Sequence, residues 1–154
     1  MKNIIATIVL GCFLNTQIAY AAIEAKCLND KGKTSPCSLD NQNGNLVIQY
    51  KMKKLAHLNK TIDGHKITRL TGGEYSRRRV AESVATAVLL TPLALFGLFS
   101  KKKIDNFGIE YTDQNNNAAS TLIQSKKKYS EGIKSMLQSI SGQQIVYQEA
   151  PAKK

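Results

Sequence analysis

Apolar and polar residues alternate along short stretches in the first half of the chain, and this alternation predicts β-strands. Between residues 46 and 53 every second side chain is apolar, as in a strand that buries one face. A second strand is expected at 66–70, because Asp-Gly and Gly-Gly pairs, which favour turns, bound it. Leu55 and Leu58 lie between these strands and could extend either of them or form a short connecting strand. Residues 22–45 are rich in turn-forming residues, and we expect an N-terminal segment there, ahead of the main domain.

The second half of the chain predicts a β-hairpin. Phe107, Ile109 and Tyr111 are separated by single small or polar residues, which indicates a strand. The run of polar residues at 113–117 is typical of a turn, and residues 118–124 make a suitable return strand.

A helix is expected after the hairpin, from residue 126 to about residue 141. Its apolar residues fall at steps of four, three, one and three and form one stripe, as an amphipathic helix needs: Tyr129, Ile133, Met136, Leu137 and Ile140. Ser125 is expected to cap its N-terminus, and Gly142 is expected to end it. Residues 143–148 suggest a last short strand, and 149–154 form a tail.

The first 21 residues have the pattern of a signal peptide. Lys2 is followed by an apolar run at 4–14, and Ala19-Tyr20-Ala21 matches the small-x-small site that signal peptidase reads. The mature chain would then begin at Ala22. Two alternatives remain open: a lipoprotein processed at Cys12, and an uncleaved membrane anchor.

Removal of residues 1–21 would leave two cysteines, Cys27 and Cys37. In an exported protein such a pair is a natural candidate for a disulfide, worth roughly 3 kcal/mol for so short a loop. Two free thiols are the alternative.

An apolar insert at 80–100 interrupts the predicted domain, and its residues 83–100 carry no charge. Eighteen helical residues would span about 27 Å, enough for one tilted membrane crossing. Pro92 near the middle instead favours a hairpin that dips into one leaflet, with both flanking basic triplets at the headgroups. A buried or self-associating soluble segment is the third interpretation.

The hairpin interpretation names two sets of contact residues. The residues expected at anionic headgroups are Arg77, Arg78, Arg79, Lys101, Lys102 and Lys103. The residues expected to insert are Val88, Leu89, Leu90, Pro92, Leu93, Leu95, Phe96, Leu98 and Phe99.

Charge and composition narrow the possible functions. The 154 residues suit a single domain, and 22 Lys and Arg against 11 Asp and Glu give a net charge of +11. Such a charge favours anionic partners, and export argues against nucleic acid. Residues 31–34 (Lys-Gly-Lys-Thr) resemble the end of a P-loop, but Cys27 stands where that motif needs glycine. The spacings of Cys27, Cys37, His57 and His65 match no familiar zinc site, and none of the motifs H-E-x-x-H, G-x-S-x-G and G-x-G-x-x-G occurs. We therefore expect no metal, cofactor or catalytic residue; an enzyme with an unconventional site that uses His57 or His65 is the alternative.

The hairpin and helix resemble a known kind of domain. Residues 107–111 (Phe-Gly-Ile-Glu-Tyr), the polar turn and the helix ending in Ser141-Gly142 look like the last hairpin and C-terminal helix of bacterial PH-like domains. The run 73–111, with its basic triplets and apolar insert, resembles small exported bacterial proteins of unassigned function. The resemblance covers roughly 46–148 and implies a small antiparallel β-barrel or sandwich closed by the C-terminal helix. It brings no catalytic residues, and the insert departs from an uninterrupted PH-like pattern.

Together these observations predict an α+β, non-enzymatic, exported protein that binds or scaffolds at the bacterial cell envelope. An anionic membrane surface is the expected partner, and an envelope protein or a second copy of the chain are further candidates. The alternative is a secreted soluble protein that binds an anionic polymer or a host surface, with the apolar segment buried or used for self-association.

Overall fold

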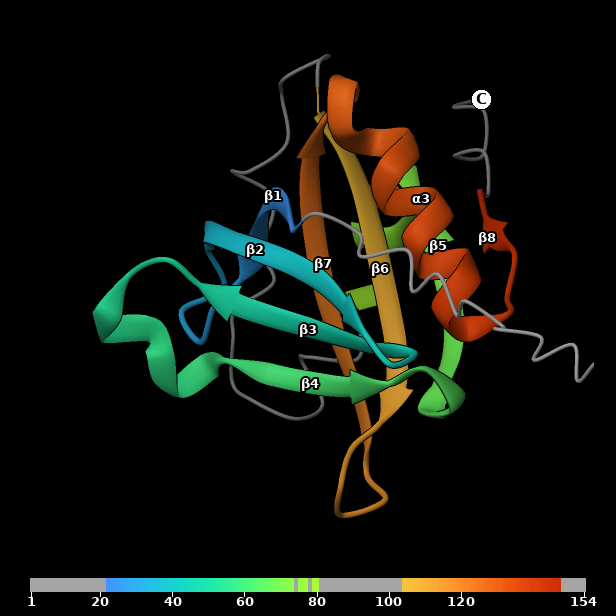
Figure 1. Cartoon of the computed structure of the whole chain (residues 1–154), viewed down its shortest axis with the longest axis horizontal. Helices are drawn as coiled ribbons and strands as arrows, with labels where there is room; N and C mark the ends of the chain where they lie inside the picture. The colour runs from blue at the N-terminus through green and yellow to red at the C-terminus, as the bar shows by residue number, and fades with distance from the viewer. Residues whose placement is uncertain (1–21, 74, 78, 81–103, 148–154) are drawn as a thin grey trace, which may run out of the picture.

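A computed structural model describes residues 22–73, 75–77, 79–80 and 104–147. The described chain forms one eight-stranded sheet and a long C-terminal helix, which confirms the α+β class (Figure 1). The strands are β1 (Ile23–Leu28), β2 (Thr34–Gln42), β3 (Asn45–Tyr50), β4 (Lys60–Asp63), β5 (Ile67–Gly72), β6 (Ile104–Thr112), β7 (Ala118–Lys126) and β8 (Ile145–Val146). The helices include η1 (Lys53–Leu58), η2 (Gly64–Lys66) and α3 (Lys127–Ser141), and the described residues of 73–80 are also helical.

The sheet is open, with strand order β4-β3-β2-β1-β7-β6-β5-β8. Neighbouring strands are antiparallel except β8, which pairs with β5 in parallel. In Figure 1, β2 to β4 run roughly horizontally while β6 and β7 run roughly vertically, so the sheet is strongly twisted. The short strands β4 and β8 remain its two edges, and the sheet therefore does not close into the barrel that was one expectation.

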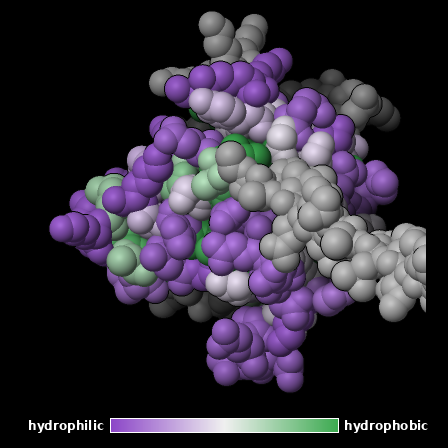
Figure 2. Space-filling view, viewed as in Figure 1, coloured by the Kyte–Doolittle hydropathy of each residue, from purple (hydrophilic) through white to green (hydrophobic). Residues whose placement is uncertain are grey.

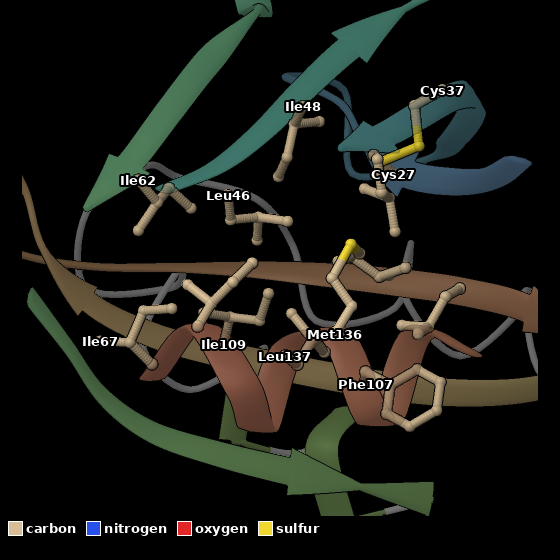
Figure 3. Close-up of a cluster of buried hydrophobic side chains, with 14 of the residues drawn as sticks. Cys27, Cys37, Leu46, Ile48, Ile62, Ile67, Phe107, Ile109, Met136 and Leu137 are labelled. Carbon is tan, nitrogen blue, oxygen red and sulfur yellow. A yellow bond between two sulfur atoms is a disulfide. The ribbon is translucent and has the colours of Figure 1, made fainter. Parts of the chain in front are cut away.

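One face of the sheet, here called the inner face, carries the hydrophobic core. Helix α3 contacts β1, β3, β6, β7 and η2. Figure 3 shows Met136 and Leu137 of α3 between Leu46 and Ile48 of β3 and the β6 side chains. Because side chains alternate along a strand, Phe107 and Ile109 point inward, whereas Gly108 and Glu110 belong to the opposite, outer face.

The predicted strands near residues 46–53, 66–70 and 107–124 are confirmed as β3, β5 and the β6–β7 hairpin. Leu55 and Leu58 extend no strand, because they lie in η1 and pack beside the core. The ladder stops at Tyr50, whose backbone N–H donates to the Asn59 side chain at 2.8 Å instead of continuing the strand. Strand β4 follows and had no counterpart in the sequence prediction.

The predicted C-terminal helix is confirmed, and only its N-terminal cap was wrong. Ser125 is buried in β7, and its hydroxyl donates to the carbonyl of Lys126 instead of capping the helix. At the other end, Gly142 has φ +67° and donates its N–H to the Gln138 carbonyl at 2.8 Å, as a helix stop requires. The predicted last strand is reduced to two residues, β8.

Residues 22–45 contribute the central strands β1 and β2, which the sequence pattern did not predict. The inward side chains of both strands include Ala25, Cys27 and Cys37, which are small or weakly apolar, so their alternation with polar residues gives only a weak strand signal. The Asn43-Gly44 pair between β2 and β3 has φ of +54° and +79°, and this two-residue loop is a strong hairpin signal that the turn-rich composition concealed.

Candidate anion-binding surface

The helical segment 73–80 holds two of the six predicted headgroup-binding residues, Arg77 and Arg79. It packs on the outer face, where a Cβ on Gly108 would lie 2.4 Å from Thr71 Oγ1 and 3.0 Å from Ser76 Cβ. The glycine in β6 therefore allows the segment to approach the sheet closely. Ser76 also donates its hydroxyl to the Gly73 carbonyl at 2.7 Å and so ties the first turn of the segment.

Arg79 is engaged with the domain itself. Its Nε lies 3.0 Å from Glu110 Oε1, and its Nη2 lies 3.3 Å from Oε2, which makes a bidentate ion pair. Both side chains are partly buried, at 36% and 21% exposure, so water screens the pair less than a fully exposed one. The pair fastens the segment 73–80 to β6. The other predicted headgroup residues, Arg78 and Lys101–Lys103, and all the predicted inserting residues lie outside the described residues.

The two strands that flank the undescribed interval 81–103 are neighbours in the sheet. Strand β5 precedes the interval and β6 follows it, and they pair antiparallel with Gly72 opposite Phe107 and Leu70 opposite Ile109. A single membrane crossing between them would place these hydrogen-bonded strands on opposite sides of a bilayer. Both flanks of the interval therefore lie on one side of any membrane.

Lysines from two separate parts of the chain act on Glu24, a residue of the outer face in β1. Lys51, just after β3, pairs with Glu24 of β1. Lys51 lowers the pKa of Glu24 most strongly, and the charges of Lys126 and Lys128 lower it further. Lys51 thus contacts Glu24, while Lys126 and Lys128 are near enough for their charges to act on it, and we call these four residues the lysine cluster.

The described surface offers little apolar area. Figure 2 shows a mostly hydrophilic face with isolated apolar patches. Of the large hydrophobic residues in the described ranges, Val146 and Tyr147 are the exposed ones. Among the helices whose residues are described, none combines the length and hydropathy needed to cross a membrane.

Each of the two histidines lies beside an aspartate. His57 Nε2 lies 3.7 Å from Asp30 Oδ2, with both side chains well exposed. His65 interacts with Asp63 through its backbone N–H at 2.9 Å, which caps η2. Nowhere in the described ranges do three His, Cys, Asp or Glu side chains gather as metal ligands would.

The hydrophobic core contains a buried tyrosine and the predicted disulfide. Tyr50 donates its hydroxyl to the Leu28 carbonyl, and burial, with a smaller contribution from Asp30, raises its pKa to about 12. Cys27 and Cys37 are fully buried and joined by a disulfide between β1 and β2, which confirms the predicted pairing. These groups stabilise the fold beneath the charged surface.

No protein family and no curated protein sequence gives a significant match to this chain. Function must therefore be inferred from the described residues themselves. The basic runs at 51–54 and 126–128 lie more than 70 positions apart in the sequence. The strand order β3-β2-β1-β7 brings both runs near Glu24.

Proposed function

We propose that this protein is an exported, non-enzymatic binding module that associates with an anionic membrane surface at the bacterial cell envelope. Its net charge of +11 supports an anionic partner, and the buried disulfide supports an oxidising compartment such as the periplasm. The sheet followed by a closing helix is compatible with a PH-like origin for the domain.

The observation that carries the proposal is the adjacency of β5 and β6 around the interval 81–103. That interval contains the uncharged run 83–100 between two basic triplets. Since both flanks are on one side of a membrane, the run can act as a shallow membrane contact, with the flanking basic residues at the headgroups except Arg79, which stays paired with Glu110. The hydrophilic surface of the described fold makes this interval the main source of apolar contact area.

A soluble binder of an anionic polymer is the second candidate. The specific observation in its favour is that the lysine cluster is exposed on the described fold and needs no contribution from the apolar run. In this case residues 83–100 would be buried or used for self-association, and the protein would be released into the periplasmic or culture fluid.

Fractionation of cells that express the tagged protein tests the proposal. Membranes are washed with high salt and then with alkaline carbonate, and the protein is followed by its tag. A matched variant replaces residues 83–100 with eighteen Gly and Ser residues and leaves both basic triplets in place. We expect the wild type to stay with the membranes through the salt wash and the variant to be released by it.

The remaining outcomes separate the two candidates. Release of both proteins by salt would show that electrostatic attraction alone holds the protein on the membrane, and it would refute insertion of the apolar run. Recovery of the wild type in the soluble fraction before any wash would refute the membrane proposal and favour the soluble binder. Folding of the variant is checked by far-UV circular dichroism, which reports on the sheet and on α3.

A further inference from the structure

The outer face near Glu24 has a regular arrangement that the strand register defines. Lys26 of β1 lies opposite Gln124 of β7, and Cys27 lies opposite Ile123 in the core. Alternation therefore places Glu24 and Lys26 on the outer face together with Gln124 and Lys126. Pro36 and Ser38 of β2, opposite Lys26 and Glu24, are the residues that Lys51 crosses to reach Glu24.

The charge on this patch is strongly positive. Three lysines and one carboxylate give the lysine cluster a net charge of +2, and Lys26 lies on the same face of β1 as Glu24. Lys26, Lys126 and Lys128 are all exposed. A flexible, exposed set of ammonium groups suits a surface of many negative charges better than one small anion.

The patch also has a defined position relative to the rest of the chain. Lys126 lies directly opposite Ile104, the first described residue after the interval 81–103. The patch is thus at the end of the sheet where β6 begins and β7 ends, at the top in Figure 1. The β6–β7 turn at 113–117 lies at the other end.

We infer that the lysine cluster, together with Lys26, is the surface that the domain turns toward anionic lipid headgroups. This inference rests on the proposed membrane association and adds its orientation: the start of β6 and the start of α3 face the bilayer, and the β6–β7 turn points away. Headgroup phosphates are the favoured partner because the patch adjoins the point where the chain returns from the apolar run.

The test compares two triple variants with equal loss of charge. The first is Lys26→Gln, Lys126→Gln and Lys128→Gln, which leaves the Lys51–Glu24 pair intact. The control is Lys31→Gln, Lys33→Gln and Lys54→Gln, at exposed positions outside the cluster. Each protein is expressed with its own N-terminal segment, purified and checked by circular dichroism. It is then mixed with phosphatidylcholine vesicles in which about a third of the lipid is anionic phosphatidylglycerol, or with vesicles of phosphatidylcholine alone.

We expect the first variant to bind the anionic vesicles on the order of 100-fold more weakly than wild type at low salt. The control variant should lose much less affinity than the first variant. Equal losses in the two variants, or none in the first, would overturn the inference and leave the proposed function intact. Failure of the wild type to bind anionic vesicles would instead overturn the proposed function. If the wild type binds soluble dextran sulfate but no vesicle, the partner is a polymer and the lipid assignment is wrong.

Discussion

Removal of the Cys27–Cys37 disulfide should cost a large part of the stability of this domain. The bond closes a loop with a sequence separation of 10 residues. In the chain-entropy treatment such a loop reduces the entropy of the unfolded chain by about 9 cal/mol/K, which is about 2.7 kcal/mol at 25 °C. The ratio of folded to unfolded protein should therefore fall about 100-fold on reduction.

The double variant Cys27→Ala, Cys37→Ala should lose more than the reduced wild type. Both side chains are fully buried in the core cluster, so truncation also removes apolar contacts. We expect a total loss of about 4 kcal/mol, the excess being the lost packing. Urea unfolding followed by far-UV circular dichroism measures both values, since the chain has no Trp to report by fluorescence.

Two comparisons keep this reasoning open to refutation. A reductant should destabilise the wild type but leave the double variant unchanged. A loss below about 1 kcal/mol on full reduction would show that the loop-closure argument does not apply to this β1–β2 hairpin. The same measurement bears on compartment, because the chain made without residues 1–21 in a reducing cytoplasm would lack this contribution.

Three further predictions concern the outer face and the core. Changing Arg79 and Glu110 to Gln, singly and together, should give a coupling of about 1 kcal/mol in urea unfolding that shrinks in high salt, and additive costs would contradict the ion pair. Tyr50→Phe should cost about 1 kcal/mol at pH 8 through loss of the bond to the Leu28 carbonyl. Burial raises the pKa of the Tyr50 hydroxyl to about 12, so the unfolded chain loses the hydroxyl proton at lower pH than the folded chain. The stability of the wild type should therefore fall more between pH 10 and 12 than that of the Phe variant, and parallel pH profiles would refute this. Gly108→Ala should destabilise by about 1–3 kcal/mol by overpacking against segment 73–80, whereas Gly132→Ala, in α3, should be neutral or stabilising; equal melting temperatures would argue against that packing.

Arg79 shows what the sequence pattern can and cannot predict about a surface residue. Arg79 was predicted as a headgroup contact because it belongs to a basic run beside the apolar insert, and the structure shows its guanidinium held by Glu110. Glu110 is 31 positions away in the sequence, and no local pattern joins the two. Electrostatic partners of this kind are set by strand pairing, which brings distant side chains onto one face.

Local chemistry, by itself, determined the elements whose signals are contained within a few residues. The apolar stripe of α3, the αL stop at Gly142 and the polar turn at 113–117 depend on neighbours one to four positions apart. The disulfide was also predicted correctly, since an exported chain would have only two cysteines to join.

Only the tertiary structure decided how those elements combine. It placed β1 and β2 in the middle of the sheet, left β4 and β8 as open edges, and brought Lys51 into contact with Glu24 of a distant strand. The physical reason is that strand order and register are set by hydrogen bonds and packing between residues far apart in the chain, which hydrophobic periodicity does not encode.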